Sequence, residues 1–181
     1  GPETIPVEPL MTFGYEDQVT LLTTISASNT AIFPAILKAQ VSWYTCKDIC
    51  VPQEANLELT IENGEKLNTF FANELSTAFL DLPKALPNKH RLEILDSNYF
   101  LQMELEGNTS IGSAYFFPEE YGLSSYSKEQ ILEINKNSLS LQIPQSEVDL
   151  KLQNFAGVLL LNNQESRTFF NVNLDLNNNQ K

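Results

Sequence analysis

The sequence is poor in several residue types, and each shortage excludes a class of protein. Only 11 lysines and arginines stand against 23 aspartates and glutamates, which gives a net charge of −12. So acidic a chain is repelled by phosphate backbones and by anionic lipid headgroups, so we expect no nucleic acid or membrane surface among its partners. The longest apolar runs, such as residues 158–161, are too short to cross a bilayer.

Cysteine and histidine are also rare. Two cysteines in 181 residues cannot form the disulfide framework on which small secreted domains depend. The only histidine, His90, lies between Lys89 and Arg91, and we interpret it as a surface residue. A single histidine leaves the usual zinc ligand sets incomplete, so we expect no zinc site. Our main interpretation of the chain includes no metal and no other cofactor. The hydrophobic content of 42% is nevertheless enough for a globular core.

Alternation of apolar and polar residues with a period of two dominates the chain and predicts an all-β fold. In the first part it predicts strands at residues 19–25, 36–44 and 57–61. Beyond residue 88 it predicts eight more, at residues 92–95, 99–105, 111–117, 131–135, 138–143, 148–152, 157–161 and 168–174. Lys136 and Asn137 are expected to form a tight hairpin turn. The eight short strands at close spacing beyond residue 88 indicate a β-sandwich.

A short helix is predicted between the two units. In residues 65–79 the apolar side chains fall at steps of three or four, as on one face of a helix. Two prolines, Pro83 and Pro87, prevent its continuation. The predicted division is therefore a cysteine-bearing β-unit at residues 1–63, a helix and proline linker at 64–88, and a second sandwich unit at 89–181.

The first unit has too few strands to close a sandwich by itself. An immunoglobulin-like sandwich takes about seven strands and about 100 residues, whereas residues 1–63 supply three predicted strands. We therefore expect this unit to be N-terminally incomplete, or to complete its sheet with strands from the second unit or from a partner. The sequence does not choose among these.

The two cysteines, Cys46 and Cys50, are separated by three residues. In an extended strand they would lie about 13 Å apart, too far for a disulfide, which needs Cα atoms within about 7 Å. The segment must therefore turn if the pair bridges, and Asp48 suits a turn. A disulfide that closes so short a loop stabilises a fold by only about 2 kcal/mol. A redox couple, a structural disulfide and a two-thiolate site for a soft metal such as Cu(I) all remain open.

The residues around the pair carry a resemblance. Residues 41–55 read VSWYTCKDICVPQEA, and a predicted strand follows. This segment closely resembles the cysteine segment in the periplasmic N-terminal region of DsbD-type thiol:disulfide interchange proteins, nearest to the ScsB-like branch. Residues 13–19 (FGYEDQV) and 114–123 (AYFFPEEYGL) resemble two further stretches of that region in the same order. The resemblance therefore covers most of the chain.

The resemblance implies an immunoglobulin-like fold, so we expect an all-β protein of two immunoglobulin-like β-sandwich units with a short connecting helix. It also implies a protein-disulfide reductase that is one periplasmic domain of a larger inner-membrane enzyme. Such a module takes electrons from a thioredoxin-like domain and passes them to periplasmic disulfide proteins. By the same resemblance, Cys50 bonds to partners, Cys46 resolves the mixed disulfide, and Phe13 or Tyr15 caps the pair. Trp43 is expected to pack beside the cysteines in the core. The alternatives are a copper-binding module that uses the same thiols and a non-enzymatic interaction domain with a static disulfide.

Overall fold

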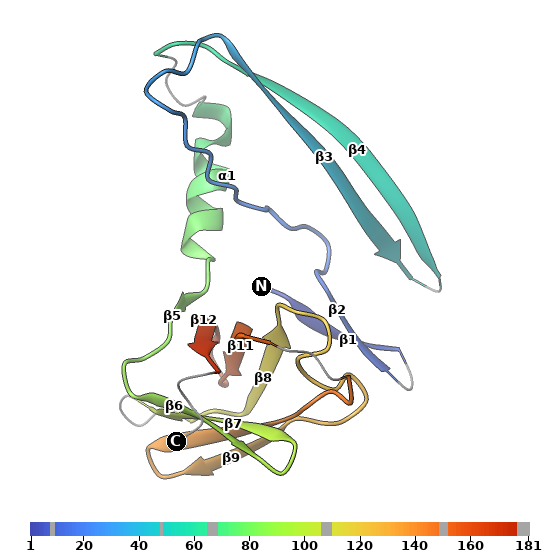
Figure 1. Ribbon diagram of the computed structural model, residues 1–181, viewed down its shortest axis with the longest axis vertical. Coiled ribbons are helices and arrows are strands. Elements are labelled where there is room, and N and C mark those ends of the chain that lie inside the picture. The colour runs from blue at the N-terminus through green and yellow to red at the C-terminus, as the bar shows by residue number, and fades with distance from the viewer. Residues whose placement is uncertain (8–9, 48, 65–68, 106–109, 149–151, 177–181) are drawn as a thin grey trace. The chain divides into compact units, whose positions relative to one another are not determined.

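The computed structural model describes residues 1–7, 10–47, 49–64, 69–105, 110–148 and 152–176, which form two compact units (Figure 1). Gly1–Thr20 and Phe79–Lys181 make up one of them, here called the sandwich unit. The other, Leu21–Ala78, is here called the hairpin unit. The chain thus leaves the sandwich unit after Thr20 and returns to it at Phe79. In the part of the chain that is described, no helix is both long and apolar enough to cross a membrane.

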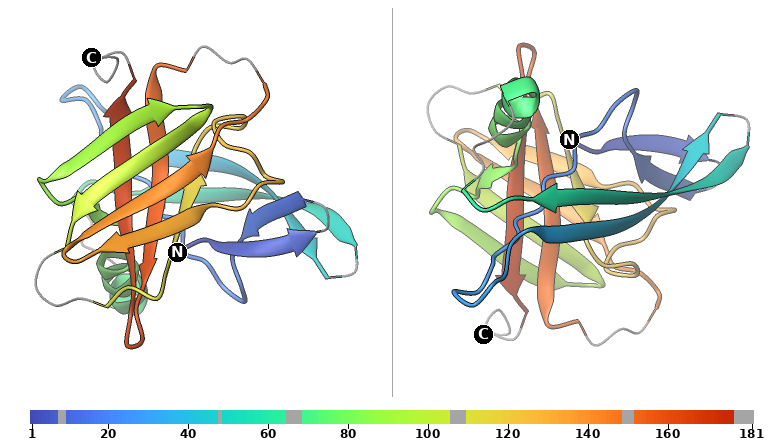
Figure 2. Two further views of the ribbon diagram at one scale, coloured as in Figure 1. Left: turned by 90° about the horizontal axis from the view of Figure 1, so that it is seen from below. Right: turned by 90° about the horizontal axis from the view of Figure 1, so that it is seen from above.

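The sandwich unit contains two four-stranded sheets, which form the crossing layers of Figure 2. One sheet has the order β6 (His90–Leu95), β7 (Asn98–Glu104), β10 (Ser138–Pro144) and β9 (Ile131–Asn135). The other has the order β5 (Lys84–Ala85), β12 (Arg167–Asp175), β11 (Asn154–Asn162) and β8 (Ser113–Pro118). Neighbouring strands are antiparallel, except that β5 and β12 are parallel. The predicted all-β class with sandwich architecture and a single short helix is confirmed.

The core of the sandwich unit lies between these sheets and follows from the alternation in the sequence. In β10, Leu139, Leu141 and Ile143 are buried, whereas the residues between them are half-buried. Two aromatic rings meet at the centre, where Phe116 of β8 stacks on Phe155 of β11 with ring centroids 4.3 Å apart. Such contacts make this core the main source of stability in the unit.

Two hairpins of the first sheet are closed by short turns. Asp96 and Ser97 join β6 to β7, and both have positive φ, as a two-residue hairpin turn requires. The predicted turn at Lys136 and Asn137 joins β9 to β10 and is confirmed. Its positive φ of 54° falls on Lys136.

The first residues of the chain form a hairpin that the sequence did not predict, β1 (Glu3–Val7) and β2 (Leu10–Gly14). The Phe13 ring lies 5.3 to 5.9 Å from the rings of Tyr115, Phe117 and Tyr126, which belong to the sandwich unit. Glu3 also forms an ion pair with Arg167 of β12 at 2.7 Å. These contacts explain why residues 1–20 belong to the sandwich unit, whereas the predicted division placed them in the same unit as the cysteines.

Two of the predicted strands differ from the structure. Residues 18–28 have no regular secondary structure, so the strand predicted at 19–25 is wrong. Val19, Leu21 and Ile25 alternate there as in a strand, but they are exposed, and no neighbouring strand pairs with them. For the strand predicted at 148–152, neither Val148 nor Leu152 lies in a strand, and residues 149–151 are outside the described residues.

The hairpin unit contains one long two-stranded sheet, formed by β3 (Ala35–Cys46) and β4 (Cys50–Ile61). The strands pair over their full lengths, from Ala35↔Ile61 to Cys46↔Cys50. Helix α1 (Thr69–Leu80) begins in this unit and ends in the sandwich unit. The helix predicted at 65–79 is confirmed from residue 69 onward, and residues 65–68 are outside the described residues.

Candidate redox site

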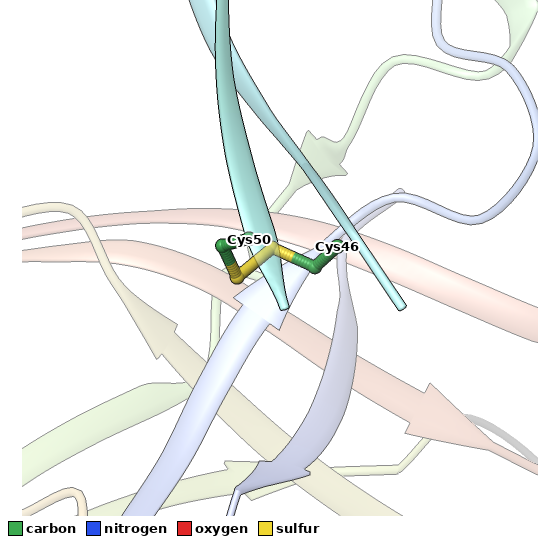
Figure 3. Close-up of a disulfide and its surroundings, with 2 residues drawn as sticks. All are labelled: Cys46 and Cys50. Atoms are coloured by element: carbon green, nitrogen blue, oxygen red, sulfur yellow. A yellow bond between two sulfur atoms is a disulfide. The ribbon is translucent and has the colours of Figure 1, made fainter. Parts of the chain in front are cut away.

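The two cysteines form a disulfide at the tip of the β3–β4 hairpin (Figure 3). Cys46 is the last residue of β3 and Cys50 the first of β4, and their Cα atoms are 4.1 Å apart. The chain therefore reverses within the three intervening residues, as the sequence required for a bridge. Asp48, the predicted turn residue, lies outside the described residues.

Hydrogen bonding at the tip fixes which backbone groups face outward. The Lys47 N–H donates to the Ile49 carbonyl oxygen at 3.2 Å. Together with the short Cα–Cα distance, this makes Cys46↔Cys50 a non-hydrogen-bonded pair of the antiparallel ladder. Because the two kinds of pair alternate, Tyr44↔Pro52 is also non-hydrogen-bonded. Pro52 therefore removes no ladder bond, because the N–H that it lacks would point to the outer edge of β4.

The hairpin has one apolar face and one polar face, and the disulfide lies on the polar one. Side chains of every second residue share a face of a strand. Besides Ile36 opposite Thr60 at its far end, the cysteine face carries Lys38, Gln40, Ser42 and Tyr44 of β3 opposite Glu58, Asn56, Glu54 and Pro52 of β4. The other face carries Leu37, Ala39, Val41 and Trp43 opposite Leu59, Leu57, Ala55 and Gln53. Both cysteines are exposed, so a foreign thiol can reach them.

The prediction that Trp43 packs beside the cysteines in the core is wrong. Its side chain is 42% exposed and belongs to the apolar face, opposite Gln53. The physical reason is its odd spacing of three residues from Cys46, which puts the two side chains on opposite faces. The residues that share the cysteine face next to the disulfide are instead Tyr44 and Pro52. Their even spacing from Cys46 and Cys50 was the signal that the sequence contained.

A small hollow lies at the tip. It has a volume of about 340 Å³ and is lined by Thr45, Lys47, Ile49, Val51 and Gln53. The Thr45 hydroxyl donates to the Gln53 side-chain oxygen at 3.3 Å across this hollow. Thr45, Val51 and Gln53 belong to the apolar face of the hairpin. Lys47 lines the hollow together with these residues, so it lies with the apolar face and not with its sequence neighbour Cys46.

The two predicted cap residues lie in the sandwich unit. Phe13 of β2 is half-buried among Tyr115, Phe117 and Tyr126. Tyr15 follows β2, and half of its surface is exposed. The role of either residue as a cap stays a prediction. His90, the first residue of β6, has its ring Nδ1 2.6 Å from the Pro87 carbonyl oxygen.

Comparison with known proteins gives two matches. Residues 1–62 match the family described as thiol:disulfide interchange protein DsbD, N-terminal. The fold is similar to the crystal structure of the N-terminal periplasmic domain of ScsB from Proteus mirabilis, with a TM-score of 0.65 and 14% identity. That alignment covers 96% of this chain and 70% of the other. No curated protein sequence matches the chain. The resemblance predicted from the cysteine segment is thus confirmed, and the family match includes both cysteines.

Proposed function

We propose, from the DsbD-type character of residues 1–62, that this chain is a periplasmic thiol:disulfide interchange domain that relays electrons through Cys46 and Cys50. Its partners would be a thioredoxin-like domain as donor and periplasmic disulfide proteins as acceptors. In this proposal the chain acts as the soluble portion of an inner-membrane protein-disulfide reductase. The observation that carries the proposal is the exposed disulfide at the hairpin tip, inside the segment that matches the family.

The exchange needs only the two sulfurs and a partner. A thiolate of the reduced donor attacks Cys50 Sγ, a new S–S bond forms, and the Cys46–Cys50 bond breaks with its electron pair on Cys46. A second donor thiolate then releases Cys50, so the donor leaves oxidised and this chain holds two thiols. In the second half of the cycle, the Cys50 thiolate attacks the acceptor disulfide. Cys46 then resolves the mixed disulfide and restores the bridge.

A purely structural role for the disulfide is weakly supported. The bridge spans four positions of the sequence, so chain entropy gives it only about 2 kcal/mol of stabilisation. The hydrophobic core lies in the sandwich unit, and neither cysteine belongs to it. Opening the disulfide therefore exposes no buried apolar surface of that core. This suits a redox-active disulfide, which must open in every cycle.

The reduction potential of the pair tests this proposal. The oxidised chain is equilibrated with glutathione buffers of graded ratio, and the free thiols are counted by alkylation. We expect a potential within the range of known exchange proteins, about −270 to −120 mV. A potential below about −300 mV would identify a structural disulfide and contradict the relay.

Trapping of the mixed disulfide tests the division of roles between the cysteines. The Cys46→Ala variant should accumulate mixed disulfides with a thioredoxin-like protein through Cys50, because the resolving thiol is gone. The matched Cys50→Ala variant should accumulate far less. Equal capture by both variants would remove the proposed assignment.

A further inference from the structure

We infer that Tyr44 is a specificity-determining residue of the exchange, because it shields Cys46 and thereby directs an incoming thiolate to Cys50. The inference rests on the proposed function, since it concerns the sulfur at which the same disulfide reacts. It assigns a role to a side chain that neither the sequence pattern nor the comparisons single out.

The direction of attack follows from the chemistry of exchange. A thiolate approaches a disulfide along the continuation of the S–S bond, on the side away from the leaving sulfur. Cys46 and Cys50 lie directly opposite each other, so their bond joins β3 to β4 (Figure 3). Attack on Cys50 therefore comes from beyond the outer edge of β4, and attack on Cys46 from beyond the outer edge of β3.

The two approaches pass different side chains. On β3, the nearest residue on the cysteine face is Tyr44, whose Cα lies about 6.6 Å from that of Cys46 at the usual rise per residue. Tyr44 is 71% exposed, so its ring is not packed into a core, and in this inference it occupies the space next to Cys46. On β4 the corresponding neighbour of Cys50 is Pro52, which is a compact ring. Steric hindrance therefore falls on the Cys46 side.

The backbone groups at the outer edges of β3 and β4 also favour an approach to Cys50 over an approach to Cys46. Pro52 has no N–H, so a further strand cannot form the ladder bond at this position of β4. Tyr44, which holds the corresponding position on β3, keeps its outward N–H and C=O. The approach to Cys50 is therefore kept clear of strand pairing, whereas the approach to Cys46 has no such protection.

Reduced glutathione provides a test that needs no physiological partner. Its thiolate attacks one cysteine to form a glutathionyl disulfide, and the other cysteine leaves as a thiolate, which takes up a proton from water or is alkylated. The oxidised chain is mixed with glutathione and quenched at early times with N-ethylmaleimide. Trypsin cuts after Lys47, so Cys46 and Cys50 appear in separate peptides and mass spectrometry counts each adduct.

We expect glutathione mainly on Cys50 and maleimide mainly on Cys46 in the natural sequence. The expected preference for glutathione on Cys50 over Cys46 is several-fold. Tyr44→Ala should bring the glutathione adducts on the two cysteines toward equal amounts, whereas Tyr44→Phe, which keeps the ring, should preserve the preference. The control is Tyr121→Ala, which removes an equally exposed tyrosine from the sandwich unit and should leave the ratio unchanged.

Two outcomes would overturn the inference: equal or greater reaction at Cys46 in the natural sequence, or a ratio unaffected by Tyr44→Ala. The ratio is independent of the reduction potential. A reduction potential below about −300 mV, together with an adduct ratio that depends on Tyr44, would therefore contradict only the relay. A reduction potential typical of exchange proteins, together with an adduct ratio that Tyr44→Ala leaves unchanged, would contradict only the role of Tyr44.

Discussion

The two units of this protein differ in where their side chains lie. In the sandwich unit, Leu101, Leu141 and Phe155 are completely buried between two sheets. In the hairpin unit, none of the residues whose burial is described is buried. The only disulfide among the described residues belongs to the unit without a core. Stability and sulfur chemistry are therefore assigned to separate parts of the chain.

This separation has a physical advantage for an exchange protein. A buried disulfide would need local unfolding before a partner could reach it, and each opening would cost packing energy. A disulfide at an exposed hairpin tip reacts without that cost.

Matched leucine truncations should separate the units most clearly. Leu141→Ala removes a completely buried side chain and should lower the free energy of unfolding by about 2–5 kcal/mol. Leu57→Ala truncates a side chain that is 56% exposed on β4, and it should cost less than about 1 kcal/mol. Urea titration followed by tryptophan fluorescence and circular dichroism measures both. Equal losses would mean that the hairpin contributes to a common core.

The buried amide of Gln130 should matter next. It accepts a hydrogen bond from the Phe116 N–H and donates one to the Phe116 carbonyl, both at 2.8 Å, as a neighbouring strand would do at the edge of β8. Gln130→Leu leaves these two backbone groups without their partner and should cost about 1–3 kcal/mol. Its control is Gln142→Leu on β10, where the side chain is half-buried. An unchanged unfolding midpoint for Gln130→Leu would contradict this role.

Reduction of the disulfide should have an effect of similar size at most, and one that is confined to the hairpin unit. Removing the bridge releases about 2 kcal/mol of chain-entropy stabilisation. Hydrogen exchange of the amides in β3 and β4 should accelerate after reduction, whereas those of β10 and β11 should keep their protection. Faster exchange in β10 would show that the redox state of the pair is coupled to the core.

The smallest effect concerns pH. Burial raises the pKa of Tyr99, Tyr115 and Tyr126, and all three belong to the sandwich unit. The folded state therefore holds these phenolic protons more tightly than the unfolded state does, so the stability that they contribute is present below pH 10 and is lost as the pH rises further. Urea midpoints measured at rising pH should fall above this value. Tyr99→Phe should reduce the fall.

The sequence predicted those elements in which a single face is buried. The alternation of β10 was recognisable because local pattern and tertiary burial agree there. The strand at 131–135 and the turn at Lys136, which pair with or lead into β10, were predicted as well. A bridge between Cys46 and Cys50 was among the alternatives that the sequence left open, since three intervening residues allow the chain to turn.

Other elements depend on contacts that local pattern does not encode. The sequence around the β1–β2 hairpin contains two prolines, Pro6 and Pro9, which hide its strand character. The aromatic residues that hold Phe13 lie about a hundred positions later in the sequence. Residues 19–25 show the opposite case, where a strand-like pattern finds no strand to pair with. Tyr44 escaped notice because its exposure is a property of the folded hairpin, although its even spacing from Cys46 already indicated a shared strand face.

The interrupted course of the sandwich unit also has a practical use. Because the chain departs after Thr20 and rejoins at Phe79, the reactive hairpin is a cassette held at both of its ends. Replacing residues 21–78 by a flexible glycine-serine linker should yield a chain without cysteine that still folds around Phe155. Conversely, hairpins with other tip sequences could be grafted between the same two points, which would turn this scaffold into a host for comparing disulfides.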